Sequence, residues 1–302
     1  MIRRTVAQFR LAATLALALL CVAAAKPKNP EVRRAQAVSD NDLTVAYETH
    51  DPSREDLAIP RVRAVSVLVE DARTGEVLYE KNADAQRAAA STQKLLTALI
   101  VAEEGYLDQN VTVRTVDTLA EPVRLNIKSG DTYQRIDLLR ALLVKSPNDV
   151  ARCLARDNAG SIALFAQKMN AKARELGATH SNFVNPNGLP MPDQYSTARD
   201  LAIIARAAYA NPTIRSIVCL PQLVFRYANG RTRQLENTNK VLKRLPYCNG
   251  MKTGYTEAAG HCLIASGTIP GGRDVIVVLL GDSKARVWQD ASALLSWGLR
   301  RM

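Results

Sequence analysis

The order of the predicted elements limits the fold of this chain more than any single motif does. Residues 63–70 and 76–80 have the composition of β-strands, and the polar segment 71–75 between them is typical of a hairpin turn. Three more strand-like segments follow only after residue 250, at 251–256, 261–268 and 274–280. The chain between the two groups is mostly helical by its hydrophobic periodicity. This order predicts an antiparallel sheet built from both chain ends, with flanking helices and an inserted helical subdomain.

Glycines and turn residues set the expected limits of the helices. The first helix begins near Ser91 and ends at Gly105, and a later one ends at Gly177, because glycine commonly follows the last helical turn. The remaining helices are expected at 135–144, 149–157, 161–176, 198–209, a short segment from 211, and 286–301. Short strand-like segments are expected at 111–113, 224–227 and 231–235.

The helix that begins near Ser91 carries a pair of residues suited to nucleophilic catalysis. Ser91 and Lys94 are three positions apart, so they share one face of a helix. A serine hydroxyl is a weak nucleophile without an adjacent base. A lysine amine becomes such a base when burial or a neighbouring cation lowers its pKa. The S-x-x-K pattern alone is weak evidence, because a chain of this length contains about one by chance.

Two later motifs strengthen this interpretation. Ser146-Pro147-Asn148 lies between two predicted helices, and Lys252-Thr253-Gly254 lies on a predicted strand. S-x-x-K, S-x-N and K-T-G in this order match a known signature of penicillin-recognising serine enzymes. From residue 62 to 299 the chain resembles the serine-type D-alanyl-D-alanine carboxypeptidases, the low-molecular-mass penicillin-binding proteins of peptidase family S11. The resemblance implies a mixed α/β (α+β) fold of the β-lactamase/transpeptidase-like type.

The resemblance assigns catalytic roles to three residues. Ser91 would attack the carbonyl of the penultimate D-alanine, and Lys94 would accept its proton. Ser146 would relay a proton toward the leaving D-alanine. The implied reaction is hydrolysis of the terminal D-Ala–D-Ala bond of peptidoglycan stem peptides through an acyl-enzyme. β-Lactam antibiotics would act as covalent inhibitors. Neither a cofactor nor a metal is implied, and the cysteine spacings resemble no metal site.

Five further residues are expected to bind the substrate. Asn148 would hydrogen-bond the substrate backbone and Lys94, and the Thr256 backbone N–H would complete the oxyanion hole with that of Ser91. Lys252 and Thr253 would meet the terminal carboxylate. Gly254 would keep the strand open to the substrate, where a side chain would crowd it.

Three other functions compete with carboxypeptidase activity. A D,D-endopeptidase that cuts cross-links would use the same site. A class A β-lactamase needs a glutamate on a loop between the second and third motifs, and residues 182–192 contain none, so only weak drug turnover is expected. A catalytically silent wall-binding module is the third alternative, although each catalytic position carries the expected residue.

One segment departs from the pattern of the family. Some members carry an arginine shortly after the last strand, where it helps to bind the substrate carboxylate. Here the nearest position is Asp282, and Lys284 or Arg286 could take over that role, or Lys252 and Thr253 could suffice. The segment 185–189 resembles a loop beside the active site of the family, and a plain turn is the alternative.

The N-terminal residues have the layout of an export signal. Residues 1–25 combine basic residues, an apolar run and a small-residue cleavage site, which predicts a signal peptide. An uncleaved membrane anchor is the alternative. Residues 26–58 are polar and are expected to form a tether, and residues 59–302 would form the catalytic domain without a C-terminal β-domain. The protein is therefore expected to be exported to the periplasm or the extracellular side of a bacterial cell envelope.

The net charge and the isolated cysteines and histidines suggest no other function. Cleavage of the signal peptide would remove three arginines and lower the formal charge from +11 to +8, a surplus that suits an anionic wall surface. The spread of Lys and Arg shows no nucleic-acid recognition pattern. In an oxidising compartment one or two disulfides could form among the four cysteines after the signal, without a pairing that the sequence defines. Cys153 and Cys262 are expected as buried thiols. His50, His180 and His261 are expected to be structural or surface residues. The four cysteines are Cys153, Cys219, Cys248 and Cys262.

Overall fold

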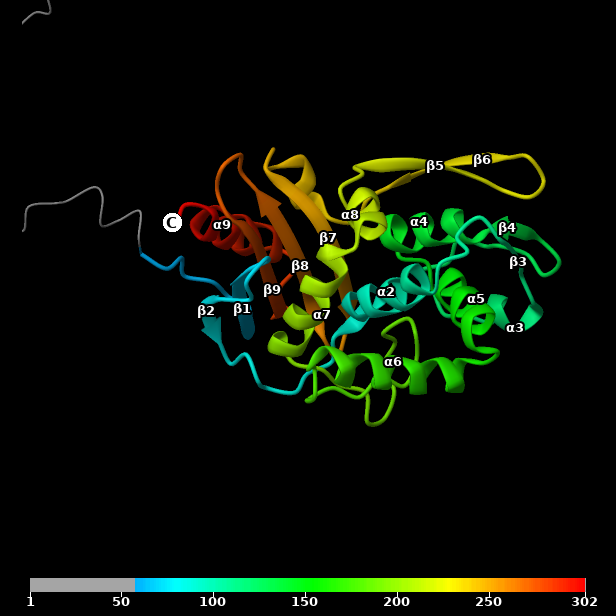
Figure 1. Ribbon diagram of the computed structural model, residues 1–302, viewed down its shortest axis with the longest axis horizontal. Coiled ribbons are helices and arrows are strands. Elements are labelled where there is room, and N and C mark those ends of the chain that lie inside the picture. The colour runs from blue at the N-terminus through cyan, green and yellow to red at the C-terminus, as the bar shows by residue number, and fades with distance from the viewer. Residues whose placement is uncertain (1–57, 302) are drawn as a thin grey trace, which may run out of the picture. The chain divides into compact units, whose positions relative to one another are not determined.

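A computed structural model describes residues 58–301, so the predicted signal peptide and nearly all of the predicted tether lie outside the described residues. A five-stranded sheet forms the centre of the described region (Figure 1). All of its neighbouring strands are antiparallel, and both chain ends contribute strands, as predicted. The strand order is β2 (Val77–Lys81), β1 (Ser66–Asp71), β9 (Asp274–Asp282), β8 (Gly260–Thr268) and β7 (Cys248–Thr256).

Successive side chains of the central strands alternate between two hydrophobic layers, one on each face of the sheet. Val67 of β1 and Val277 of β9 point toward α9 (Val287–Leu299), whereas Leu68 and Val278 belong to the layer shared with the other helices. Successive side chains of a strand point to opposite faces, so a sheet covered on both sides has apolar residues at every position. α9 covers one face of the sheet and α7 (Ala198–Ala210) packs on the other (Figure 1).

The inserted helical subdomain lies between β2 and β7 in the chain. Its helices are α2 (Lys94–Glu104), α4 (Arg135–Lys145), α5 (Asn148–Ala159), α6 (Ile162–Leu176) and α8 (Pro212–Val218). Their ends follow local chemistry: the Ser161 hydroxyl accepts a hydrogen bond from Leu164 N (3.1 Å), and Gly177 takes a left-handed conformation after α6. Two small antiparallel sheets complete this part, β3 (Asn110–Thr112) with β4 (Thr132–Gln134), and β5 (Gln222–Arg226) with β6 (Thr232–Glu236).

Three short elements were not predicted from the sequence. They are α3 (Thr115–Thr118), β4 and the 3₁₀ turn η2 (Lys240–Lys243). β4 is a strand because it pairs with β3 and because Tyr133 packs against Phe225, with ring centroids 5.3 Å apart. Such short segments carry no periodic signal of their own, since their partners lie far away in the sequence.

The cysteines form no disulfide within residues 58–301. Cys153, Cys219, Cys248 and Cys262 are all free thiols. The predicted burial of Cys153 and Cys262 is confirmed, and burial raises the pKa of Cys262 to about 11. None of the helices in this region has the length and apolar character needed to cross a membrane.

Candidate active site

Ser91 lies where the chain enters the helical subdomain. It belongs to the 3₁₀ turn η1 (Ala90–Gln93), which leads directly into α2. Lys94 is the first residue of α2, and its Nζ donates to Ser91 Oγ over 2.8 Å. The predicted serine–lysine pair is therefore in hydrogen-bonding contact.

The amine of Lys94 is buried among neutral acceptors. Beside Ser91 it donates to Asn148 Oδ1 over 2.8 Å and to the Asn187 carbonyl over 2.7 Å. The Lys94 side chain has no accessible surface, and its pKa lies well below the usual value for lysine. Burial is the main cause, the charge of Lys252 adds to it, and Asp149 opposes it. These surroundings shift the amine toward its neutral form. With only two N–H groups, the neutral amine would donate to Asn148 and Asn187 and accept from the Ser91 hydroxyl.

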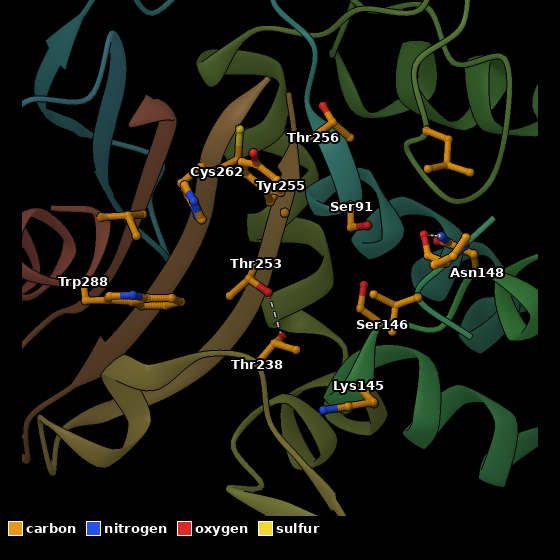
Figure 2. A pocket seen from close by; sticks show the side chains of 16 residues that line it. Ser91, Lys145, Ser146, Asn148, Thr238, Thr253, Tyr255, Thr256, Cys262 and Trp288 are labelled. Atoms are coloured by element: carbon orange, nitrogen blue, oxygen red, sulfur yellow. Dashed lines mark hydrogen bonds between the residues drawn. The ribbon is translucent and has the colours of Figure 1, made fainter. Parts of the chain in front are cut away.

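Ser146 and Asn148 lie at the corner between α4 and α5. Ser146 ends α4 in a left-handed conformation (φ 66°), and Pro147 is extended before α5 begins at Asn148. The buried Ser146 Oγ has no hydrogen-bond partner within the described part of the chain. Figure 2 shows this hydroxyl directed toward Ser91. The Asn148 amide donates to the carbonyls of Glu121 and Pro122 (3.0 and 3.1 Å), which fixes its oxygen toward Lys94.

Asp149 supports this corner from behind and was not singled out from the sequence. Its carboxylate accepts hydrogen bonds from the backbone N–H groups of Leu125 (2.9 Å), Asn126 (2.7 Å) and Ile127 (3.3 Å). These bonds hold the segment that follows Pro122 against the start of α5. An acidic residue in a helical first turn is common, so the sequence carried no signal for this role.

β7 supplies the opposite wall of the site. Lys252 is almost fully buried, and its Nζ donates to the Thr253 carbonyl over 2.9 Å. Burial lowers the pKa of Lys252 to about 7. The Thr253 hydroxyl donates to the hydroxyl of Thr238 over 2.7 Å. Thr238 was missed in the sequence, where it is one polar residue of an Asn-rich loop.

Gly254 is required for close packing between β7 and the nucleophile. A Cβ atom at this position would lie 2.8 Å from the backbone nitrogen of Ser91 and 3.0 Å from that of Thr92. The expectation that Gly254 leaves the strand open to substrate is therefore incomplete. The absence of a side chain first of all lets β7 approach the backbone of η1.

The loop 182–194 closes the site beside Ser91, in the place that the sequence resemblance implied for its segment 185–189. The Gln194 side chain accepts from the backbone N–H groups of Val184 and Asn185 (3.0 and 3.1 Å). The Thr97 hydroxyl donates to the Pro186 carbonyl over 2.7 Å, which ties the loop to α2. These bonds place the Asn187 carbonyl where it accepts a hydrogen bond from Lys94. The sequence did not reveal this contact.

An open cavity of about 310 Å³ lies in front of Ser91 (Figure 2). His261 lines it and stacks on Tyr255, with ring centroids 4.4 Å apart. This partly exposed position fits the prediction of a structural or surface residue, His180 is exposed, and His50 lies outside the described residues. The lining residues are Ser91, Pro122, Val123, Lys145, Ser146, Asn148, Leu189, Thr238, Thr253, Gly254, Tyr255, Thr256, His261, Cys262, Val287 and Trp288.

Three of the residues discussed from the sequence do not line the cavity. They are Lys94, Lys252 and Asp282, which lies nearest to the position where some family members carry an arginine. Lys94 and Lys252 lie beneath the surface of the cavity and do not line it. Asp282 and Arg286 line a separate hollow together with Arg63, and Lys284 lines neither. Of the eight residues predicted for the site, Ser91, Ser146, Asn148, Thr253, Gly254 and Thr256 line the cavity directly.

The low pKa of Lys252 gives a testable effect on stability. The unfolded chain, with an ordinary lysine pKa of 10.5, binds more protons above pH 7 than the folded chain does. Stability should therefore rise as the pH increases from 7 to about 8.5. In Lys252→Met the rise should be smaller, and in Lys243→Met, an exposed residue paired with Glu236, it should be unchanged. Urea unfolding at several pH values measures this, and equal slopes in all three proteins would contradict it.

The sequence matches a known family over most of its length. The family model for D-alanyl-D-alanine carboxypeptidase (Peptidase_S11) matches residues 53–284. The chain belongs to this family of serine peptidases. The family was recognised correctly from the three sequence motifs.

Curated relatives and solved structures agree with this assignment. D-alanyl-D-alanine carboxypeptidase DacB2 of Mycobacterium tuberculosis is 37% identical over 80% of this chain and 84% of its own length. A D-alanyl-D-alanine endopeptidase of Pseudomonas aeruginosa is 34% identical over 77% of this chain and 76% of its own. A crystal structure of a D-alanyl-D-alanine carboxypeptidase from M. tuberculosis superposes with a TM-score of 0.77 at 35% identity, covering 81% of this chain and 94% of that one. These similarities confirm the predicted penicillin-binding type of fold.

Proposed function

We propose that this protein hydrolyses the terminal D-Ala–D-Ala bond of peptidoglycan stem peptides through an acyl-enzyme on Ser91. The observation that carries the proposal is the buried Lys94 amine, 2.8 Å from the Ser91 hydroxyl, with neutral groups as its hydrogen-bond partners. A neutral amine at this distance can take the hydroxyl proton as the oxygen attacks.

In the first step a bond forms between Ser91 Oγ and the carbonyl carbon of the penultimate D-alanine, while Lys94 accepts the hydroxyl proton. The backbone N–H groups of Ser91 and Thr256 stabilise the oxyanion. The C–N bond then breaks, and a proton reaches the leaving D-alanine nitrogen through Ser146, whose buried hydroxyl is free for that relay. Water attacks the resulting ester in the second step and releases the shortened peptide.

The substrate-binding roles follow from the walls of the cavity. Asn148 holds Lys94 and contacts the substrate backbone, and the wall that carries Thr253 meets the terminal carboxylate, where the Thr253 hydroxyl donates to that of Thr238. Lys252 acts through its electrostatic potential from beneath β7 rather than by contact, because it is buried and does not line the cavity. Gly254 lets the strand lie close to Ser91.

β-Lactams would acylate Ser91 in the same way and would be released slowly. The loop 182–194 beside the site contains no glutamate that could activate a deacylating water. The alternative activity is cleavage of cross-links, which the P. aeruginosa relative named as an endopeptidase supports.

Export and the domain limits remain predictions. The proposed substrate lies outside the cytoplasm, in the bacterial cell envelope. A signal peptide at 1–25 and a tether at 26–58 would deliver the catalytic domain, 59–302, to that compartment.

Two measurements test the proposal. The intact mass of the protein after incubation with benzylpenicillin should increase by one adduct, and digestion should locate it on the peptide that contains Ser91. Incubation with muropeptide pentapeptides should release D-alanine faster than it cleaves cross-linked dimers. Folded protein without an adduct and without released D-alanine would favour the silent wall-binding module instead.

A further inference from the structure

Lys145 is a lysine at the edge of the catalytic cavity to which the roles above give no function. It is the last residue of α4, directly before Ser146, and its side chain is half-buried. It lines the cavity, and its amino group has no hydrogen bond or ion pair to any residue from 58 to 301. In Figure 2 the side chain extends from the end of α4 toward the side of the cavity that holds Thr238.

Lys145 dominates the charge of this cavity. Among the described residues that line it there is no other lysine or arginine, and no aspartate or glutamate. The amines of Lys94 and Lys252 are buried and hydrogen-bonded to protein groups. Asp282 and Arg286 lie near the position where some family members carry a carboxylate-binding arginine, and both line a different hollow. An anionic group that enters the cavity therefore meets Lys145 as its accessible cation.

Lys145 lines the same cavity as the hydroxyl-bearing residues Thr238 and Thr253. The backbone N–H of Thr238 donates to the Val144 carbonyl over 3.1 Å, which ties the loop before β7 to the end of α4. The Thr238 hydroxyl accepts from Thr253 over 2.7 Å, so its own proton remains available to a ligand. An ammonium group and a hydroxyl donor on adjacent walls form a suitable site for a carboxylate.

The position of Lys145 next to Ser146 indicates which carboxylate would bind. In the proposed function Ser146 delivers the proton to the nitrogen of the leaving D-alanine. The carboxylate of that residue is one carbon away from the same nitrogen, so it must lie on the Ser146 side of the cavity. We propose that Lys145 binds the terminal carboxylate of the leaving D-alanine, with Thr238 as a second donor, and so makes the enzyme selective for free C-termini. This inference rests on the proposed function.

The test compares a substrate that carries this carboxylate with one that lacks it. The two peptides are an N-acylated L-lysyl-D-alanyl-D-alanine and its C-terminal amide. Wild-type protein should prefer the acid, and Lys145→Ala should lower kcat/KM for the acid by about 10- to 100-fold, mainly through KM, with little effect on the amide. Lys145→Arg should keep most of the preference because it keeps the charge.

A matched control separates this contact from a general effect of charge. Lys128→Ala removes one exposed lysine that does not line the catalytic cavity, and it should leave the acid-to-amide ratio unchanged. An unchanged ratio in Lys145→Ala, or an equal loss for both peptides, would overturn the inference. A change confined to peptides with acidic side chains in the stem would also overturn it, because Lys145 would then bind a different carboxylate.

The experiment also distinguishes failure of this inference from failure of the proposed function. If wild-type protein forms the Ser91 adduct and releases D-alanine while Lys145→Ala keeps the acid-to-amide ratio, only the inference fails. If wild-type protein does neither, the proposed function itself fails.

Discussion

Replacing Lys94 with Met is expected to lower the rate of Ser91 acylation by benzylpenicillin by about 10²- to 10⁴-fold, which is the range for loss of a general base. Methionine has a similar length and polarity suited to the buried position, but it cannot accept a proton. Among residues 58–301 Lys94 has no carboxylate as a hydrogen-bond partner, so its removal leaves no unpaired buried acid there, and the variant should fold. Quenched-flow labelling measures the rate, with Ser91→Ala as the background.

The pH dependence of the wild-type rate follows from the same residue. The pKa of Lys94 is lowered well below the usual lysine value, chiefly by burial, which shifts the amine toward its neutral form. Acylation should slow as the pH falls through the pKa of Lys94, because the protonated amine cannot accept the serine proton. A thermal melt checks that the wild-type protein, Lys94→Met and Ser91→Ala are folded at each pH. Lys94→Met with more than a tenth of the wild-type rate would show that another group is the base.

Replacing Gly188 with Ala is expected to have the largest effect on stability. Gly188 has φ +83°, and a Cβ atom there would lie 1.9 Å from the carbonyl oxygen of Ala90. The overlap is with backbone, so it cannot be relieved by a change of rotamer. The sum of steric overlap and left-handed strain should destabilise the protein by about 3 kcal/mol or more. Denaturant unfolding measures this loss.

Gly177→Ala is the matched control for this substitution. Gly177 has a similar φ of +93°, but no heavy atom of the described part of the chain, outside its own neighbours and helix, lies within 4 Å of the added Cβ. The Gly177→Ala substitution should therefore lower the free energy of unfolding by about 1 kcal/mol, through left-handed backbone strain alone. Gly188→Ala should also slow acylation of Ser91, because the displaced loop moves the Asn187 carbonyl away from Lys94. Equal costs at the two glycines would mean that the loop yields without strain.

The residues predicted most successfully were those with a local signal. The S-x-x-K spacing placed Ser91 and Lys94 on one side of a helical turn, and Gly105 ended the helix as expected. The five strands of the main sheet were each located, although β7 begins at Cys248, three residues before the predicted start. β4 escaped detection because its strand character comes from pairing with β3 rather than from its own three residues.

The contacts that were missed join segments that are distant in the sequence. Asn187 lies 93 positions from Lys94, yet its carbonyl accepts a hydrogen bond from the Lys94 amine. His261 was interpreted as a structural or surface residue because the serine–lysine mechanism needs no histidine. Its place at the edge of the cavity beside Tyr255 comes from the pairing of β7 with β8, which the sequence did not reveal.

By itself, the sequence determined the family, the order of the main strands and helices, and the candidates for the reactive side chains, because periodicity, helix ends and motif spacing are local properties. Only the tertiary structure decided the state of those side chains. The burial that lowers the pKa of Lys94 and the position of Lys145 at an otherwise uncharged cavity both arise from segments brought together by folding. Solvent exclusion and long-range contact depend on the whole packed molecule, and no short stretch of residues encodes them.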